Sequence, residues 1–272
     1  MKNFIMNDST FYRNCGNDKP LSIIAGPCVF ESEQHMDDMV GWIEEIMVMH
    51  NVNWIYKTSF DKANRTSADS FRGQGIDQAI YAFEKHANQG LEILTDVHEA
   101  WQCDIIPATV IQIPAFLCRQ TDLIAAAAGS GKVVNIKKGQ FLSPYEMEPL
   151  IEKVEHFGGK KIMRTERGTT FGYNNLVVDM RSLEIMKRQN DYPVIMDCTH
   201  AVQSPGGNGN SSGGDRTMVS AIARAAVAVG VAGVFLEVHQ DPDNAPSDGS
   251  NMINLEKLHK LVGQLKKIDA LK

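Results

Sequence analysis

The segment KTSFDKANR carries the side chains with the clearest chemical meaning in this chain. Its cations Lys57, Lys62 and Arg65 are separated by small or polar residues that include Ser59 and Asn64. Ammonium and guanidinium groups bind phosphate or carboxylate oxygens, and an amide side chain hydrogen-bonds to sugar hydroxyls. A solvated basic loop is the alternative, but the segment directly follows a predicted strand, where barrel proteins carry their chemistry. These residues therefore predict a site for an anionic ligand.

A candidate metal-ligand set comprises Cys28, His200, Glu237 and Asp248. These residues follow predicted strands near the two ends of the chain, which become neighbours when a barrel closes. A thiolate, an imidazole and two carboxylates suit Zn²⁺, Fe²⁺, Mn²⁺ or Co²⁺. The spacing alone leaves two alternatives open: Cys28 is a small buried residue, or His98 or His239 supplies the imidazole.

A second candidate for anion binding is the run Ser211-Ser212-Gly213-Gly214, which is predicted to open a helix. Backbone N–H groups at a helix start bind phosphate, and barrel phosphate sites favour the loops after strands seven and eight. The alternative is a plain helix cap followed by flexible glycines.

The elements that must position these groups are strand-like and helix-like runs that alternate along the chain. Strands are predicted at 21–26, 52–57, 91–96, 109–113, 133–137, 161–164, 194–197 and 233–238. Helices are predicted at 33–50, 70–88, 99–105, 120–128, 144–157, 176–189, 213–229 and 254–268. About eight βα units with nearly continuous apolar strands predict an α/β protein with a closed (β/α)₈ TIM barrel.

An open doubly wound sheet would need a Gly-rich phosphate turn after its first strand, and Gly26-Pro27-Cys28 does not supply one. We therefore expect residues 20–272 to form one barrel domain. Residues 1–19 are expected to be an N-terminal extension that forms a short hairpin or a plug.

Polar side chains lie at or just past the carboxyl ends of the predicted strands. They are Cys28, Lys57, Asp96, His98, Gln112, Lys137, Lys138, Arg164, Glu166, Arg167, Asp197, His200, Glu237 and His239. The carboxyl ends of the strands form the catalytic face of a TIM barrel, so we expect these side chains to gather there. Cations from three different loops would converge, which leaves room for more than one phosphate or carboxylate.

The composition restricts the partners and the compartment. The chain has 272 residues and a formal net charge of −6, which disfavours non-specific nucleic-acid binding. No apolar run approaches the ~20 residues that span a bilayer, and residues 1–6 lack a signal-peptide pattern. The five cysteines show no paired spacing, which indicates a reducing compartment. We expect a cytoplasmic protein that binds neither nucleic acid nor membranes.

Several blocks of sequence match a known family. They are IAGPC at 24–28, KTSFDKANR at 57–65, TDVHE at 95–99, QIPAFLCRQTD at 112–122, NIKKGQF at 135–141, ERGTTFGYNNL at 166–176, DCTH at 197–200 and EVH at 237–239. Nearly the whole chain from Leu21 onward resembles the 3-deoxy-D-manno-octulosonate 8-phosphate synthases. The related 3-deoxy-D-arabino-heptulosonate 7-phosphate synthases, which use erythrose 4-phosphate, typically carry Lys-Pro-Arg-Thr where this chain has Lys62-Ala63-Asn64-Arg65.

The resemblance implies that phosphoenolpyruvate, D-arabinose 5-phosphate and water condense to the eight-carbon acid phosphate and inorganic phosphate, in lipopolysaccharide precursor synthesis. By resemblance, phosphoenolpyruvate is held by Lys62, Lys138 and Arg167, with Lys57 and Gln112 nearby. The sugar phosphate meets Asn64, Arg65 and Ser212, with Ser59 in the same pocket. Water or protons are handled by Asp96, His98 and His200. Arg119 reaches a neighbouring subunit's site, which implies a homotetramer.

This family has a metal-dependent branch with Cys and a metal-independent branch with Asn at one position, and Cys28 resembles the first. The resemblance therefore implies a divalent ion (Zn, Fe, Mn or Co) on Cys28, His200, Glu237 and Asp248. The chain departs from the family pattern at Gln240 and Ser250, in the loop that supplies Asp248.

Three other functions remain open on the residues alone. A Schiff-base aldolase would form an imine at Lys57 or Lys137. A related synthase would accept erythrose 4-phosphate. A sugar-phosphate sensor would keep the pocket without catalysis.

Overall fold

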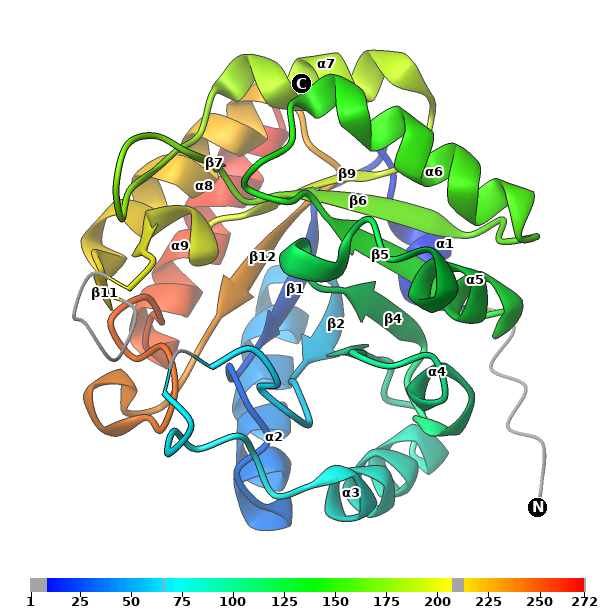
Figure 1. Cartoon of the computed structure of the whole chain (residues 1–272). Helices are drawn as coiled ribbons and strands as arrows, with labels where there is room; N and C mark the ends of the chain where they lie inside the picture. Colours follow the sequence, from blue (N-terminus) through cyan, green and yellow to red (C-terminus); the bar gives the residue numbers. More distant parts are fainter. Residues whose placement is uncertain (1–8, 66, 207–212, 272) are drawn as a thin grey trace.

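The computed structural model describes residues 9–65, 67–206 and 213–271, in which eight parallel strands close into a barrel (Figure 1). The strands are β1 Ser22–Gly26, β2 Asn53–Lys57, β3 Ile93–Asp96, β4 Val110–Ile113, β5 Val133–Lys137, β6 Ile162–Glu166, β9 Val194–Asp197 and β12 Gly233–Glu237. Around the barrel their order is β1-β12-β9-β6-β5-β4-β3-β2, so the first and last strands are neighbours. The predicted TIM barrel is confirmed.

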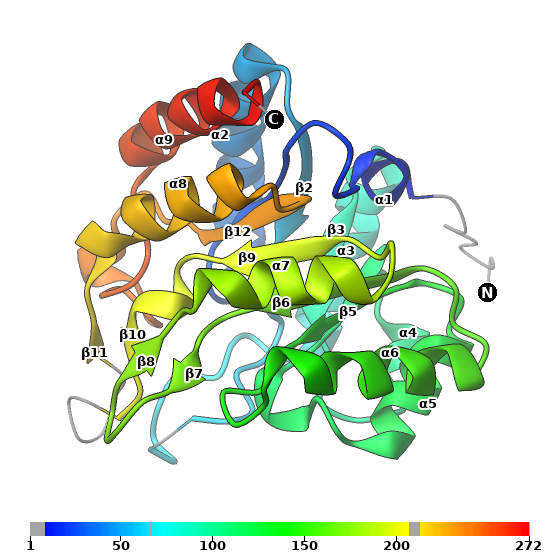
Figure 2. The same ribbon diagram turned by 90° about the horizontal axis from the view of Figure 1, so that it is seen from above.

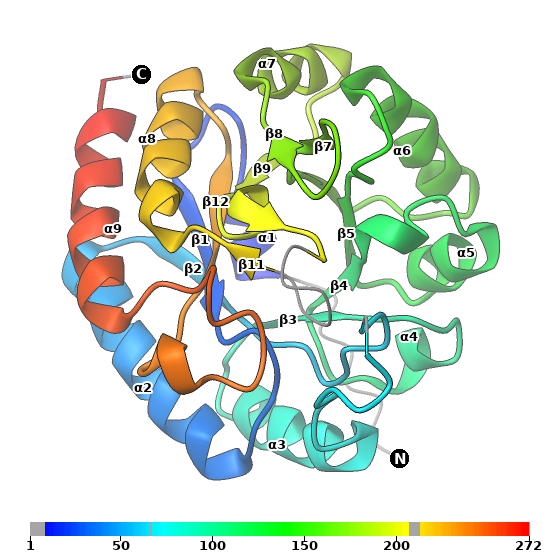
Figure 3. The same ribbon diagram turned by 60° about the vertical axis from the view of Figure 1, so that its left-hand side comes forward.

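A layer of helices surrounds these strands (Figure 3). They are α2 Glu33–His50, α3 Ile76–Asn88, α4 Gln102–Ile105, α5 Thr121–Gly129, α6 Met147–His156, α7 Met180–Gln189, α8 Val219–Val229 and α9 Leu255–Asp269. Local signals set their ends: Ser32 caps α2 by accepting the N–H of His35, and Asn51 at φ 48° terminates it. Within the described ranges, no helix combines the length and apolar character needed to cross a bilayer.

The amino-terminal end of the barrel is filled by the short helix α1, Thr10–Asn14. Phe11 of this helix is buried inside the barrel, in a cluster with Ile24, Ile55 and Phe235. Its backbone N–H donates to the Glu92 carboxylate at 2.6 Å. Figure 2 shows α1 at the opposite end of the barrel from the small sheets β7–β8 and β10–β11. The described part of the extension is therefore a helical plug and not a hairpin, and it leaves the carboxyl ends of the strands for the site.

Two helices begin later than predicted because the preceding chain forms loops over the barrel. The helix predicted from residue 70 starts at Ile76, since Gly73 and Gly75 adopt φ values of +130° and +88°. These angles lie outside the helical region and are tolerated by glycine. The helix predicted from residue 99 starts at Gln102.

The predicted starts at residues 176 and 213 are displaced by short hairpin strands. Leu176–Val177 form β8, which pairs with β7 Thr169–Thr170. Gly213–Gly214 form β11, which pairs with β10 Gln203–Ser204. The helix start predicted at residue 213 is therefore wrong, because α8 begins only at Val219. Ser211 and Ser212, the first half of the predicted phosphate seat, lie outside the described residues.

Candidate active site

A cavity of about 570 Å³ opens at the carboxyl ends of the barrel strands. Many of the predicted site residues line it: Lys57, Lys62, Asn64, Arg65, Asp96, His98, Gln112, Arg167, His200, Glu237 and Asp248. They come from loops that are far apart in the sequence, and closure of the barrel brings them together. This is the face on which TIM-barrel enzymes carry their active sites.

Two arginines provide anion-binding positions in this cavity. Arg65 follows β2 and Arg167 follows β6, and three strands separate β2 from β6 in both directions around the barrel. Arg65 Nη2 and Arg167 Nη1 are buried and have no hydrogen-bond partner among the described residues. A buried guanidinium nitrogen without a partner is costly, and a phosphate or carboxylate oxygen satisfies it. The cavity can therefore bind substrates that place one anionic group near each arginine.

Of the two adjacent lysines at the end of β5, Lys137 lines the cavity and Lys138, the expected phosphoenolpyruvate ligand, does not. Lys137 lines the cavity, and its ammonium group contacts Asp197 and lies 3.5 Å from His200 Nδ1. Successive side chains of a strand point to opposite faces. Lys138 is consequently fully buried outside the cavity lining.

Lys138 instead joins the two loops that follow β5 and β6. Its ammonium nitrogen donates to the Leu142 carbonyl and the Thr169 hydroxyl, both at 3.1 Å, and lies 3.3 Å from Glu166 Oε1. Glu166 in turn accepts the N–H groups of Arg167 and Gly168 at 2.9 and 2.7 Å. This network fixes the turn that carries Arg167 into the cavity.

A chain of buried hydrogen bonds holds Lys62. The Ser59 hydroxyl is fully buried, accepts from Lys62 Nζ at 2.8 Å, and donates to Asp96. Asp96 also accepts from the Gln112 amide. Ser59, which the resemblance places in the sugar-phosphate pocket, thus positions the ammonium group of Lys62.

The two titratable groups on this side of the cavity have defined charge states. Burial alone would raise the pKa of Asp96, but Lys62, Lys57 and Lys137 hold it below its ordinary value. Burial lowers the pKa of His98, although Asp96 opposes this. At neutral pH, Asp96 is therefore a carboxylate that accepts hydrogen bonds, and His98 is a neutral imidazole.

The predicted metal ligands converge at the junction of β1 and β12. Ligand atoms of Cys28, Glu237 and Asp248 lie within 4.8 Å of one another. His200 Nε2 lies 3.7 Å from Glu237 Oε2 and 3.9 Å from Asp248 Oδ2. His200 Nδ1 lies 2.8 Å from Asp197 Oδ2, a contact that fixes the ring and turns Nε2 toward the carboxylates.

The donor chemistry of this set fits a divalent ion. Glu237 Oε2 is buried without a hydrogen-bond partner among the described residues, although Lys57 binds the other oxygen. A bound cation would satisfy that oxygen. Burial and Glu237 raise the pKa of Cys28, so its thiol needs a metal ion to become a thiolate at neutral pH. The Ser247 hydroxyl lies 2.9 Å from Cys28 Sγ and supports this side of the set.

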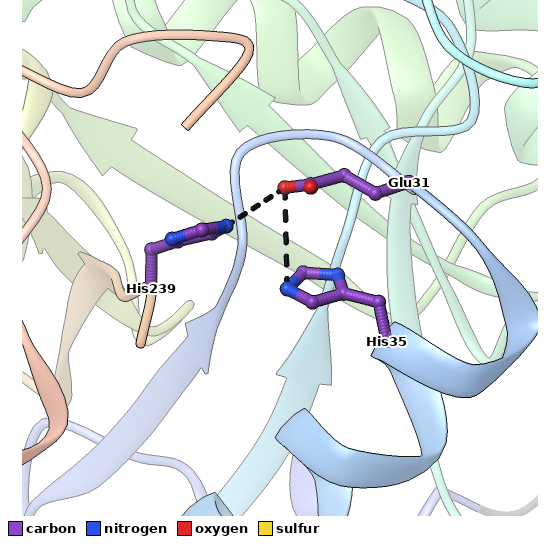
Figure 4. A group of neighbouring side chains, drawn as sticks. All are labelled: Glu31, His35 and His239. Atoms are coloured by element: carbon purple, nitrogen blue, oxygen red, sulfur yellow. Dashed lines mark hydrogen bonds and ion pairs between the residues drawn. The ribbon is translucent and has the colours of Figure 1, made fainter. Parts of the chain in front are cut away.

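The two other histidines considered as ligands lie elsewhere. His98 is on the Asp96 side of the cavity, in edge contact with Phe60. His239 hydrogen-bonds to Glu31 in a separate cluster (Figure 4).

Glu237 gives a prediction for the dependence of stability on pH. Burial alone would raise the pKa of its carboxyl, but Lys57, His200 and Lys62 lower it to about 2. In the unfolded chain the group titrates at about 4.3, so its stabilisation is complete above about pH 5 and is lost as the pH falls toward 2. The loss is on the order of 3 kcal/mol. Urea unfolding measures the free energy of unfolding at pH 5 and at pH 3. The decrease between these two pH values should be smaller for Glu237→Gln than for the unmodified chain, and an equal decrease would contradict the prediction.

Arg119 and Arg164 are among the predicted polar residues that do not line the cavity. Arg119 is exposed, and its backbone carbonyl accepts from Lys153. Arg164 points away from the barrel interior and donates to Gln189 and to the Asn190 carbonyl after α7, both at 3.0 Å. Arg164 is therefore a structural cation that ties β6 to the end of α7.

The sequence reasoning missed several lining residues: Gln140, Gln203, Arg216 and Ser247. Arg216 pairs with Asp243 at 2.6 Å, which joins the loops after β9 and β12. Gln203 accepts from Arg167 at 2.9 Å. These residues lie inside long loops rather than at strand ends, so strand position gave no signal for them.

The lysines considered for a Schiff base are both engaged. Lys57 donates to Glu237 and to the Cys28 carbonyl, and Lys137 pairs with Asp197. An imine needs a free neutral amine. The buried pair of Lys57 with Glu237 argues against an imine at that residue. Burial lowers the pKa of Lys137, which favours a neutral amine, although Asp197 opposes this.

Comparison with known proteins agrees with the resemblance. The family model described as DAHP synthetase I family matches residues 5–271. A protein of Nitrobacter hamburgensis is 57% identical over 259 residues, covering 94% of this chain and 90% of the relative. Proteins of Bradyrhizobium diazoefficiens and a Chelativorans species are 55% and 54% identical, covering 94% of this chain and 92% and 93% of the relatives. All three are named 2-dehydro-3-deoxyphosphooctonate aldolase. The chain belongs to the DAHP synthetase I family.

Proposed function

We propose that this chain is a 3-deoxy-8-phosphooctulonate synthase, a transferase of lipopolysaccharide precursor synthesis. It condenses phosphoenolpyruvate with D-arabinose 5-phosphate and water and releases inorganic phosphate. The observation that carries the proposal is the pair of guanidinium groups, Arg65 and Arg167. Each has a nitrogen without a partner among the described residues, and the two line one cavity from loops that follow opposite strands of the barrel. A reaction between two anionic substrates needs such a separation of binding positions. The names of the similar proteins support the same activity.

In this proposal, phosphoenolpyruvate lies between Lys62 and the pair Lys137 and Arg167, with Gln112 nearby. Carbon three of the enol attacks the sugar aldehyde, and positive character develops at carbon two, where water adds. The lysines orient the enol phosphate and stabilise the charge that develops on it as it leaves. Asp96, an ionised carboxylate, accepts a hydrogen bond from a reacting hydroxyl or water.

The sugar phosphate lies on the side of Arg65 and Asn64, both of which line the cavity. Asn64 provides a donor and an acceptor for a sugar hydroxyl, whereas the proline found there in the related heptulosonate synthases provides neither. Ser212 is proposed for the same phosphate by family resemblance. The sensor alternative is not favoured by any feature of the cavity.

The test is phosphate release from phosphoenolpyruvate with arabinose 5-phosphate and erythrose 4-phosphate side by side. We expect kcat/KM to be at least ~10-fold higher with arabinose 5-phosphate, because a site that hydrogen-bonds a hydroxyl rejects a ligand that lacks it. Asn64→Ala should reduce this preference. Asn244→Ala removes an exposed amide side chain from another loop and should leave the preference unchanged. Equal use of both sugars would contradict the proposed specificity, and ligand binding without phosphate release would indicate a sensor.

We further propose a divalent ion on Cys28, His200, Glu237 and Asp248. When bound, the ion would act as a Lewis acid that orients an oxygen of the aldehyde or of water. The protein side of this arrangement is the Asp197 contact that orients His200, and Lys57, which neutralises one oxygen of Glu237.

A homotetramer in the cytoplasm is proposed for the assembled enzyme. Arg119 is exposed, and Phe116 in the same loop is 57% exposed. All five cysteines are free thiols, as a reducing compartment requires. Light scattering should give four times the 30.1 kDa chain mass. If Arg119 completes a neighbouring site, Arg119→Ala should raise the KM for arabinose 5-phosphate by ~10-fold or more with the tetramer intact; a monomer of full activity would refute both parts.

A further inference from the structure

A second group of metal-ligating side chains lies outside the active-site cavity (Figure 4). Glu31 precedes α2, His35 lies in the first turn of α2, and His239 follows β12. One ligand atom from each residue lies within 4.8 Å of those of the other two. Their side chains are 23%, 11% and 4% exposed, respectively, so the group is accessible from solvent through Glu31 and His35. None of the three belongs to the set around Cys28.

We propose that Glu31, His35 and His239 form a second divalent-metal site, selective for an imidazole-preferring ion such as Zn²⁺, Co²⁺ or Ni²⁺. Two imidazoles and one carboxylate match the ligand preference of these ions better than that of Mg²⁺ or Ca²⁺, which favour all-oxygen sets. Gln240 provides a fourth donor, because its Oε1 atom lies 2.9 Å from His35 Nε2. Four donors is the usual number for a closed zinc site.

The spacing of the ligand atoms fits such an ion with small movements. Glu31 Oε1 lies 2.9 Å from His239 Nε2 and 4.0 Å from His35 Nε2. Ligand atoms at zinc bond lengths of about 2.0–2.1 Å in a tetrahedron lie roughly 3.3 Å from one another. Both distances are therefore within 1 Å of the required value. The 4.0 Å distance is also too long for a hydrogen bond, so Glu31 and His35 do not satisfy each other directly.

Existing hydrogen bonds oppose metal binding and set its expected strength. Gln240 Oε1 is an acceptor, so His35 carries its proton on Nε2 and must give up that proton when an ion binds there. The N–H of Asp241 donates to His239 Nδ1 at 3.0 Å, so the neutral ring carries its proton on Nε2. An ion on Nε2 would move that proton to Nδ1, where it would face the N–H of Asp241. This peptide must then turn away when the ion binds. The second site should consequently be weaker than the Cys28 set and should fill after it.

The test is a titration of the full-length, metal-stripped protein with Co²⁺, followed by two readouts. Equilibrium dialysis counts the bound ions, and near-ultraviolet absorption reports a thiolate ligand, which only the Cys28 set contains. We expect two Co²⁺ ions per chain: the first with the thiolate absorption band and the second without it. His35→Ala should bind only the first ion. His156→Ala, which removes an exposed histidine at the end of α6, should still bind two.

Two further variants separate ligand loss from misfolding. His35→Gln keeps a polar side chain of similar size, and Glu31→Gln keeps the hydrogen bond with His239 but removes the charge. Each should weaken the second ion at least ten-fold while the first ion and its thiolate band are retained. A single Co²⁺ per unmodified chain that shows the thiolate band, or a second ion retained at full affinity in His35→Gln and Glu31→Gln, would overturn the proposal. The thiolate band and phosphate release report the Cys28 set and the proposed reaction separately from this count.

Discussion

Lys137→Met is expected to lower kcat about 10³-fold, the effect of losing one preorganised charge in a catalytic cavity. Lys137 is the β5 cation that lines the cavity, and it lies between Asp197 and the ring of Phe235, 3.8 Å from the ring centre. Its removal takes away a positive charge from the position proposed for the enol phosphate. Because His200 still contacts Asp197, the fold should survive. Steady-state phosphate release and thermal unfolding of the same preparation provide the measurement.

Lys138→Met is the matched control one residue along the chain. It breaks a fully buried pair with Glu166 and leaves carbonyl oxygens without a donor, at a cost of about 3–5 kcal/mol. For a chain of this size the midpoint of thermal unfolding should fall by ~10 °C, with a smaller effect on kcat at temperatures where the variant is folded. The opposite result would be an active Lys137→Met, together with a Lys138→Met variant that loses turnover at an unchanged unfolding midpoint. That result would support Lys138 as the phosphoenolpyruvate ligand, as the sequence predicts.

Removal of divalent ions is expected to lower turnover by about 10³-fold, since a Lewis-acidic ion contributes several kcal/mol to charge stabilisation. Mn²⁺ or Co²⁺ should restore activity after chelation. The reason lies in the protein: Glu237 Oε2 is buried without a partner, and Cys28, His200 and Asp248 surround it. The experiment measures phosphate release after exhaustive dialysis against a chelator and determines the metal content of the same sample.

Two variants show whether the ion acts at this set. Cys28→Ala should lose the ion and the activity together. Ser247→Ala should retain the ion with roughly 10-fold weaker affinity, because the hydroxyl only supports the thiolate. Full turnover of the chelated protein at undetectable metal content would place this chain outside metal-dependent catalysis.

The sequence was sufficient to predict the barrel because each strand is a short apolar run that ends in polar residues. Closure of the barrel then follows from general rules for parallel strands. It places β1 between β2 and β12, and so brings Lys57 close to Glu237. The distinction between Lys137 and Lys138 did not follow, because it depends on the face to which each strand-end side chain points. A shift of one residue reverses that face.

The conformations of the loops are the second feature that the sequence did not predict. Gly213–Gly214 pairs with Gln203–Ser204 in a two-stranded sheet, and this strand pairing replaces the helix that the local sequence predicts. Arg216 and Ser247 reach the cavity through similar loop contacts, which no periodic pattern encodes. The cluster of Glu31, His35 and His239 likewise depends on the approach of two loops.

The pairing of β1 with β12 has a consequence for how the protein matures. Ser22 pairs with Gly233 and Gly26 with Glu237, so this seam joins the beginning of the barrel sequence to its end. During synthesis, the seam forms only after the last strand has left the ribosome, and contacts of such long sequence separation form slowly. Cys28 and Glu237 flank the seam, so a nascent chain lacks the complete ligand set. If the proposed ion binds there, it can bind only after this seam has closed, and a refolding chain should gain metal affinity only as its last strand docks.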